Sequence, residues 1–115
     1  MIRGVVYEID LGRPRGHEQQ GRRYGLVVSP SDMPWSMATV IPTSTNAQAA
    51  VFRPVVEVAG RQTRLLIDQI RSIDTAYIGE PVEVLSRADL EDVEVRLAHY
   101  LGIVPMAADG RTRDE

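Results

Sequence analysis

The segment GVVYEIDL, residues 4–11, alternates apolar and polar side chains in the manner of a half-buried β-strand. Its apolar members fall on one face of such a strand: Val5, Tyr7, Ile9 and Leu11. Short apolar runs follow at intervals of about ten residues, and they predict further strands at 24–29, 38–45, 52–58, 63–70 and 80–85. Short strands at this spacing are typical of a small barrel or sandwich, and they argue against alternating strands and helices.

Two of these predicted strands have distinctive sequences. The run YGLVVS, 24–29, is apolar and β-branched, so we expect a strand that is buried on both faces. Pro42 lies inside the run ATVIPTST, 38–45, and has no N–H to donate. We therefore expect the end of that strand to lie at a sheet edge or in a bulge.

One helix is predicted after residue 85. Ser86 is a good N-cap, and Asp89 occupies the third helical position of a capping box, with Asp replacing the usual Glu or Gln. Four apolar residues then recur at helical spacing: Leu90, Val93, Leu97 and Leu101. Gly102 is a natural helix end. The predicted fold class is therefore mainly β, a small barrel followed by a C-terminal α-helix, and the polar segment 104–115 is predicted to be a mobile tail.

The composition limits the kind of protein and of chemistry. The chain has 115 residues, 43% of them hydrophobic, which suits one globular domain. No apolar run approaches the roughly 20 residues that span a membrane, and the N-terminus does not look like a signal peptide, so we expect a cytoplasmic protein without a membrane partner. The chain has no cysteine, and its two histidines lie far apart in the sequence. We therefore expect organic side chains to do the chemistry, with no metal and no cofactor.

Positive charge is concentrated in the first two thirds of the chain. The net charge is −3, yet residues 1–78 carry nine arginines against seven carboxylates. The run RPRGHEQQGRRYG, 13–25, gathers four of these arginines and a histidine directly before an apolar strand, which predicts a loop that meets an anion. All thirteen basic residues are arginine, which suits forked phosphate contacts, but we favour a GC-rich genome as the explanation.

Several co-linear motifs carry a family resemblance. The segment RGVVYEIDLGRPRGHEQQGRRYGLVVS, 3–29, resembles the opening of the MazF/PemK toxin family, whose R-G-x-[VI]-Y/W-x-x-[DN]-L motif precedes a G-S-E-Q-x-G-x-R-P loop and a V-L-V-x-S strand. TVIPTST (39–45), LLIDQIRSID (65–74) and LSRADLEDVEVRLAHYLGI (85–103) resemble later segments of the family in the same order. The resemblance predicts one MazF/PemK-like toxin domain over 1–103.

The resemblance implies a fold, a reaction and partners. The fold would be the SH3-like barrel of CcdB, MazF and PemK toxins, assembled as a homodimer. The activity would be metal-independent cleavage of single-stranded RNA at short sequences, in which the ribose 2′-hydroxyl attacks phosphorus and leaves a 2′,3′-cyclic phosphate and a 5′-hydroxyl. This reaction needs a base, an acid and donors for the charge that develops on the phosphate oxygens. A cognate antitoxin with an acidic disordered segment would hold the toxin inactive.

Four residues are candidates for catalysis. Arg23 matches the catalytic arginine, whose forked guanidinium can bind two phosphate oxygens. Ser44 stands where the family usually has a catalytic threonine, and Thr45 takes this role if the alignment shifts by one residue, because neighbours in a strand point to opposite faces. His17 stands in the loop where serine is common, and it either assists proton transfer or only contacts RNA.

Further residues are predicted to contact RNA: Glu18, Gln19, Arg22, Gln69, Arg71 and Trp35. Strand alternation would place Gln69 and Arg71 on one face, where the amide can contact a base edge and the arginine can hold phosphate or pair with Glu18. Trp35 either stacks a base or is buried. Tyr24 replaces the proline that usually follows the catalytic arginine, which puts the loop geometry in question.

Two other functions stay open at this stage. One is a CcdB-like toxin that binds DNA gyrase without catalytic residues, although the C-terminal sequence lacks the aromatic end that this function would want. The other is a degenerate member that binds only RNA or its antitoxin, because serine replaces threonine at position 44.

Overall fold

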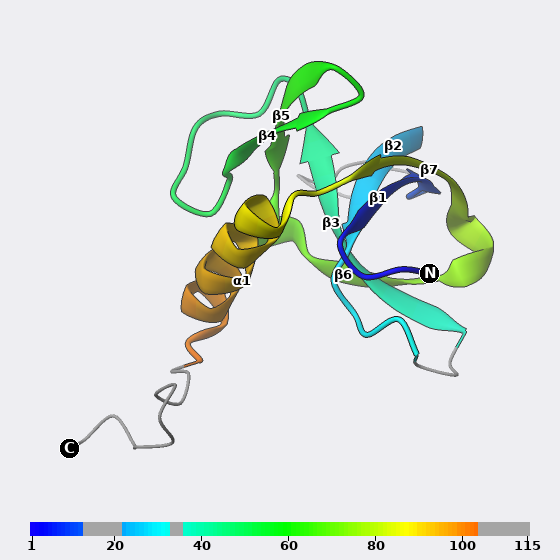
Figure 1. The fold of residues 1–115 in the computed structure, drawn as a ribbon. Helices are drawn as coiled ribbons and strands as arrows, with labels where there is room; N and C mark the ends of the chain where they lie inside the picture. The colour runs from blue at the N-terminus through cyan, green and yellow to red at the C-terminus, as the bar shows by residue number, and fades with distance from the viewer. Residues whose placement is uncertain (13–21, 33–35, 104–115) are drawn as a thin grey trace.

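Antiparallel strands and one C-terminal helix make up the computed structural model, which describes residues 1–12, 22–32 and 36–103 (Figure 1). The strands are β1 (Val5–Asp10), β2 (Arg22–Val27), β3 (Met37–Ser44), β4 (Val55–Val58), β5 (Arg61–Leu65), β6 (Arg71–Asp74) and β7 (Ile78–Val84). The 3-10 turns η1 (Ile67–Gln69) and η2 (Thr75–Tyr77) flank β6, and α1 (Arg87–Leu101) follows β7. The predicted fold class, mainly β with a C-terminal helix, is confirmed.

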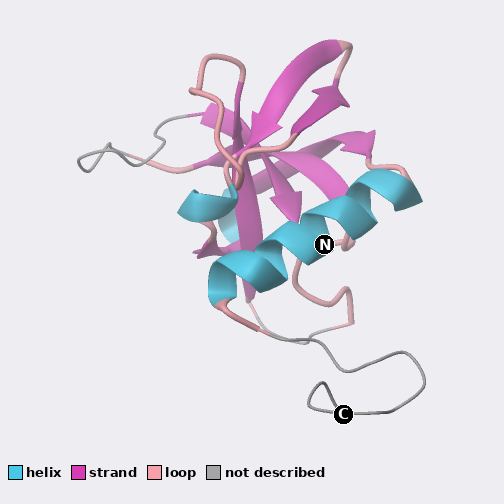
Figure 2. Cartoon of the chain, turned by 90° about the vertical axis from the view of Figure 1, so that its left-hand side faces the viewer, coloured by secondary structure: helices cyan, strands magenta, loops and turns pink. Residues whose placement is uncertain are grey.

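The strands form one curled sheet in the order β4-β5-β3-β2-β1-β7. The long strand β3 pairs with β2 along one side, and along its other side it pairs first with β6 and then with β5. Figure 1 shows the sheet curling into a half-barrel, and Figure 2 shows α1 lying across one side of it. The strand β3 therefore joins the two parts of the sheet.

Each face of the sheet carries its own apolar core. The first cluster comprises Val5, Tyr7, Ile9, Leu11, Val27, Ala38, Val40, Ile73 and Ile78. The second cluster comprises Val6, Leu26, Ile41, Val56, Val58, Leu65, Ile67, Leu85 and Val93. Because Leu26 and Val27 belong to different clusters, the prediction that the second strand is buried on both faces is confirmed.

The first strand is more deeply buried than its alternation predicted. The four apolar residues predicted to share a face are all buried in the first cluster. However, Val6 on the opposite face is also 0% exposed, because it packs in the cluster to which α1 contributes Val93 and Leu90. The half-buried prediction is therefore wrong for the first half of β1, and only its second half, at Glu8 and Asp10, alternates with exposed side chains.

The predicted strand at 63–70 is broken in the structure. The strand β5 ends at Leu65, η1 turns the chain, and the unpredicted strand β6 begins at Arg71. Leu65, Leu66 and Ile67 are all fully buried in succession, so tertiary packing at a turn imitates a continuous apolar strand. The predicted strand at 52–58 starts only at Val55; Phe52 lies in a turn and packs edge-on against Tyr100 of α1, with 5.1 Å between the ring centroids.

Pro42 is buried inside β3, at a point where one side of the strand has no strand partner, so the predicted edge is present locally. The carbonyl oxygen of Pro42 accepts a hydrogen bond of 2.8 Å from the N–H of Leu66, on the side of β3 that faces η1. The N–H that proline lacks would point to the same side, where the neighbour of β3 changes from β6 to β5. The sheet therefore tolerates this proline because no strand pairs there.

Both ends of α1 agree with the sequence prediction. Ser86 Oγ accepts a hydrogen bond of 3.1 Å from the N–H of Asp89, and Gly102 adopts a left-handed φ of 70°.

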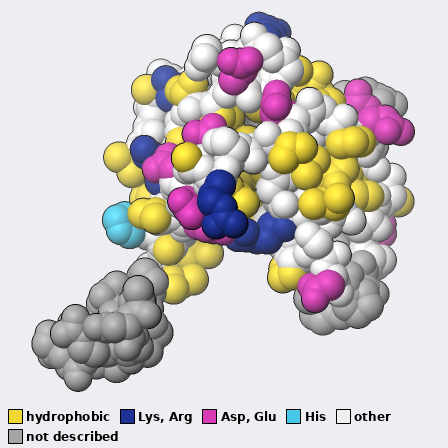
Figure 3. Space-filling model, viewed as in Figure 1, with side chains coloured by type: hydrophobic (Ala, Val, Ile, Leu, Met, Phe, Trp, Pro, Cys, Tyr) yellow, Lys and Arg dark blue, Asp and Glu magenta, His cyan; other side chains and the backbone are white. Residues whose placement is uncertain are grey.

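An ion pair joins the N-terminal segment to the helix, because Arg3 lies 2.6 Å from Glu94 of α1. Figure 3 shows arginine side chains lying beside acidic ones on the face seen in Figure 1.

We expect Gly4→Ala to destabilise the fold more than Gly60→Ala does. Both glycines have left-handed φ angles, 88° and 81°, so alanine is strained by about 1–2 kcal/mol at either position. Only at Gly4 does an added Cβ meet another residue, because it would lie 3.1 Å from Leu90 Cδ2, whereas nothing lies within 4 Å at Gly60. Urea unfolding should show about 1 kcal/mol of additional loss for Gly4→Ala. Equal losses would contradict a role for the Leu90 contact.

Candidate active site

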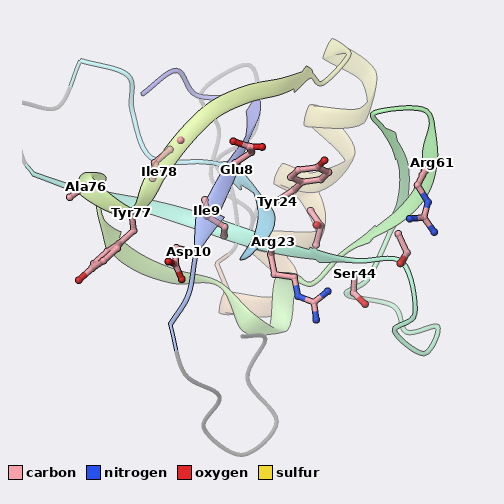
Figure 4. Close-up of a pocket in the computed structure, with 13 residues that line it drawn as sticks. Glu8, Ile9, Asp10, Arg23, Tyr24, Ser44, Arg61, Ala76, Tyr77 and Ile78 are labelled. Atoms are coloured by element: carbon pink, nitrogen blue, oxygen red, sulfur yellow. The ribbon is translucent and has the colours of Figure 1, made fainter. Parts of the chain in front are cut away.

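One pocket of about 550 Å³ opens where the ends of β1, β2 and β3 meet the η2–β7 segment (Figure 4). Its lining residues are Glu8, Ile9, Asp10, Arg23, Tyr24, Thr43, Ser44, Thr45, Arg61, Ala76, Tyr77, Ile78 and Gly79. These residues come from both faces of the sheet, because the pocket lies at the ends of the strands. It contains two arginines, two carboxylates and three hydroxyl-bearing residues of β3 and its C-terminal end.

Arg23 and Ser44 are brought together in this pocket. The pairing of β2 with β3 ends at Gly25 and Pro42, and the alternation of side chains beyond this pair puts Arg23 and Ser44 on the same face. Both side chains then project from the face that carries the first core cluster. Figure 4 shows the guanidinium and the hydroxyl extending toward the same side of the sheet. Two groups of the predicted catalytic set therefore face one space.

The hydroxyl of Ser44 is held in place by the turn that follows it. Its Oγ accepts a hydrogen bond of 3.1 Å from the N–H of Asn46, and the residue is only 8% exposed. Because the oxygen accepts this bond, its proton can be donated to a ligand in the pocket. Thr45 also lines the pocket and is exposed, but it follows the last residue of β3. Of the two alternatives, Ser44 is the one that shares a face with Arg23.

Ile9 lines the pocket beside Arg23 and packs over Gly25, and sequence reasoning assigned neither of them to the site. Ile9 is the pairing partner of Arg23 across β1 and β2. A Cβ on Gly25 would lie 2.6 Å from Ile9 Cδ1, so only glycine lets the isoleucine lie over this position. This contact fixes an apolar neighbour next to the guanidinium.

Other lining residues were also missed by the sequence analysis. Glu8 and Asp10 are the exposed positions of an amphipathic strand, which marks them only as solvent-facing. Arg61 follows the turn at Ala59 and Gly60, and Tyr77 lies in η2, where no motif pointed to a site. Only the folded chain brings these residues from separate segments into one pocket.

Several predicted RNA-contact residues cannot be placed against the pocket. His17, Glu18, Gln19 and Trp35 lie outside the described residues. The backbone of Arg22 begins β2 opposite Asp10.

Gln69 and Arg71 do not line the pocket. Gln69 belongs to η1, and Arg71 begins β6, where it pairs with Val40 of β3. The prediction that they share one face of a continuous strand is wrong, because the chain turns between β5 and β6.

The neighbouring residue Asp68 has a structural role. Its carboxylate accepts two hydrogen bonds from Arg53, one of 3.1 Å from Nε and one of 2.8 Å from Nη2. The Tyr100 hydroxyl donates a bond of 3.3 Å to the backbone oxygen of Asp68, and Arg96 donates one of 2.6 Å to the backbone oxygen of Val51. These contacts join the segment before β4 and η1 to α1. The hydrogen bonds from Arg53 lower the pKa of Asp68 despite the opposing effect of burial.

We expect Asp68→Asn to weaken the fold at pH 7 and to reduce its sensitivity to acid. A carboxylate whose pKa is lower in the folded than in the unfolded state stabilises the fold above about pH 4, and this contribution is lost as the pH falls through the lowered pKa. The pair is partly exposed, so the loss at pH 7 should be about 1 kcal/mol. Urea unfolding at a series of pH values from 7 to 2.5 measures the free energy of unfolding of both proteins, with Asp32→Asn as the control. If the free energy of unfolding of Asp68→Asn fell as steeply in acid as that of the wild type, the structural role of Asp68 would be contradicted.

No helix in residues 1–12, 22–32 and 36–103 is long and apolar enough to cross a membrane. Within the same ranges, no group of three or more His, Asp or Glu side chains is arranged to hold a metal ion.

The chain resembles known toxins over most of its length. A candidate toxin of Mycobacterium tuberculosis is 56% identical over 105 residues, covering 90% of this chain and 99% of that protein. Endoribonuclease MazF9 of the same species is 29% identical over 116 residues, covering 90% and 98%. The crystal structure of MazF from Deinococcus radiodurans superposes with a TM-score of 0.79 at 25% identity, covering 90% and 97%. The MazF of a MazE–MazF complex from that organism gives a TM-score of 0.75, also at 25% identity and over the same shares of the two chains.

The family model agrees with these similarities. The model described as PemK-like, MazF-like toxin of type II toxin–antitoxin system matches residues 2–101, which include every strand and the helix. This chain therefore belongs to the PemK-like, MazF-like toxins of type II toxin–antitoxin systems.

Proposed function

We propose that this toxin is a metal-independent, sequence-specific endoribonuclease that cleaves single-stranded RNA. The observation that carries the proposal is the placement of Arg23 and Ser44 in one pocket of a chain that belongs to the MazF-like family. A named endoribonuclease among its relatives supports the same activity. The alternative of a gyrase-binding toxin finds no comparable support in the pocket, since binding alone does not require an arginine and a hydroxyl to face one space.

The proposed reaction is an attack of the ribose 2′-oxygen on the adjacent phosphorus. A new P–O2′ bond forms while the P–O5′ bond breaks, which leaves a 2′,3′-cyclic phosphate and a 5′-hydroxyl end. One proton leaves the 2′-hydroxyl to a base, and one proton reaches the departing 5′-oxygen from an acid. The atoms balance without a metal ion or a co-reactant.

Arg23 and Ser44 would stabilise the charge that develops on the phosphate. The guanidinium of Arg23 offers two parallel donors to the non-bridging oxygens, and Ser44 Oγ–H can supply a third. Ile9 next to Arg23 excludes water from one side, which strengthens such hydrogen bonds. His17 is our candidate for proton transfer, because an imidazole exchanges protons near neutral pH.

We further propose that the toxin acts as a homodimer and is held inactive by a cognate antitoxin. The family description places such toxins in two-component systems, and a MazF of the same fold has been solved together with MazE. An acidic, disordered antitoxin segment would suit the arginine-rich sequence of residues 13–23.

We expect Arg23→Ala to abolish most of the cleavage of a long unstructured RNA in EDTA. Removing one donor to a developing oxyanion lowers the rate about 10²- to 10³-fold. Arg87→Ala, on the exposed side of α1, is the control and should cut like the wild type, since its contact with Glu91 is a long surface pair of 3.9 Å. Mapping of the cut sites should reveal discrete positions with cyclic-phosphate ends. A wild-type protein that cuts no RNA would overturn the proposal, and gyrase supercoiling would then test the alternative.

Substitution of the two neighbouring hydroxyls tests which of them acts. Ser44→Ala should lower the cleavage rate about 10- to 100-fold, because it removes a hydrogen bond to a charged group. Thr45→Ala should leave the rate within about twofold, since Thr45 does not share the face of Arg23. Single-turnover kinetics measure both variants, with thermal unfolding as the check on folding. The reverse order of effects would show that Thr45 is the catalytic hydroxyl.

A further inference from the structure

The pocket continues beyond Arg23 and Ser44 to a second group of side chains. Glu8 is the pairing partner of Tyr24 across β1 and β2, so both project from the face opposite to that of Ile9 and Arg23. Figure 4 shows Glu8 and Tyr24 on one side of the strands and the guanidinium of Arg23 on the other. All of these residues line the same cavity, which therefore reaches around the strand ends.

The carboxylate of Glu8 is positioned by a bulge in β7. β7 pairs with β1 at Tyr7 and again at Ile9. Between these two pairs β1 has one residue, Glu8, whereas β7 has two, Gly79 and Glu80, so β7 bulges opposite Glu8. A Cβ on Gly79 would lie 3.3 Å from Glu8 Oε1 and 3.4 Å from Glu8 Cβ. The glycine therefore leaves room for the side chain of Glu8 to lie against β7.

The polar groups of this second set are open to a ligand. The ring of Tyr24 packs against the second core cluster, which anchors it, while the residue remains partly exposed. Across the pocket, Arg61 projects from β5 (Figure 4). Within residues 1–12, 22–32 and 36–103, the side chains of Glu8, Tyr24 and Arg61 form no hydrogen bond or ion pair. An exposed carboxylate thus stands beside an anchored aromatic ring.

The chemistry of a carboxylate selects one RNA base. An ionised carboxylate only accepts hydrogen bonds, and its two oxygens can take two parallel donors. Guanine offers two adjacent donors on one edge, N1–H and N2–H, whereas adenine and cytosine place an acceptor beside their amino group and uracil has a single N–H between two carbonyls. An aromatic ring provides a stacking surface for a base, and Arg61 can hold a backbone phosphate.

We propose that Glu8 and Tyr24 form a guanine-binding subsite that sets part of the cleavage specificity of this toxin. The proposal rests on the proposed ribonuclease function for its biological meaning, but the binding of guanine can be tested without cleavage. It moves base recognition from Gln69, where the sequence placed it, to the pocket that contains Arg23. Glu8 acts on the choice of site and takes no part in the reaction at phosphorus.

The first test measures binding to 2′-O-methyl oligoribonucleotides, which lack the free 2′-hydroxyl and cannot be cut. Each oligonucleotide is a uridine run with one central guanine, or with hypoxanthine, 7-deazaguanine or adenine in its place. Guanine and 7-deazaguanine share the N1–H and N2–H donors and should bind about tenfold more tightly than hypoxanthine, which lacks the amino group, and than adenine. Glu8→Gln should reduce this ratio to about one, while Glu57→Gln on β4, outside the pocket, should keep it. Equal binding of guanine and hypoxanthine by the wild type overturns the subsite.

The second test compares cut sites and separates the two proposals. Wild-type sites should share a guanine at one fixed position relative to the cut, and Glu8→Gln should cut sites with other bases there. Gly79→Ala should weaken the preference for guanine while the carboxylate is kept, because the new methyl group crowds it. An unchanged site profile in Glu8→Gln overturns the subsite and leaves the ribonuclease standing. If the wild-type protein cuts no RNA but binds guanine more tightly than hypoxanthine, the ribonuclease proposal is overturned and the guanine subsite stands.

Discussion

The register of β2 between β1 and β3 is the constraint on which the pocket depends. Side chains alternate along a strand, so a slip by one residue would exchange every side chain of β2 between the two faces. Gly25 opposes such a slip, because a Cβ at this position would lie 2.6 Å from Ile9 Cδ1 and every other residue of β2 has a Cβ. Leu26 and Val27, each buried in a different core cluster, hold the strand from both faces. This fit places Arg23 beside Ser44 and Tyr24 beside Glu8.

The same alternation divides the chemistry of the pocket between two faces. Arg23 belongs to the face of the first cluster, on which Ser44 also lies, and the next residue, Tyr24, belongs to the opposite face, on which Glu8 is its pairing partner. A single dipeptide thus contributes one residue to the proposed phosphate site and one to the proposed base site. Because different side chains serve the two tasks, substitutions can change the rate and the choice of site separately.

The sequence alone predicted those parts of the fold that depend on local chemistry. The apolar face of β1 follows from alternation, and the ends of α1 follow from Ser86 and Gly102, which act within one turn. The break between β5 and β6 was missed because Leu65, Leu66 and Ile67 are buried by distant residues, which a local pattern cannot reveal. For the site, the family motifs led to Arg23 and Ser44. Glu8 was missed because an exposed position in an amphipathic strand does not show what lies opposite it.

Tyr24 shows how a departure from the family pattern can be accommodated and used. A proline after the catalytic arginine would fix the backbone at this point, and its absence put the geometry of the loop in question. In the structure, β2 pairs with β1 from Arg22 to Leu26, and this regular pairing fixes the backbone at Tyr24 without a proline ring. The tyrosine ring packs against the second core cluster, and Tyr24 lines the pocket together with Glu8. Proline could not extend so far, so it is the tyrosine at this position that supplies the aromatic wall of the proposed subsite.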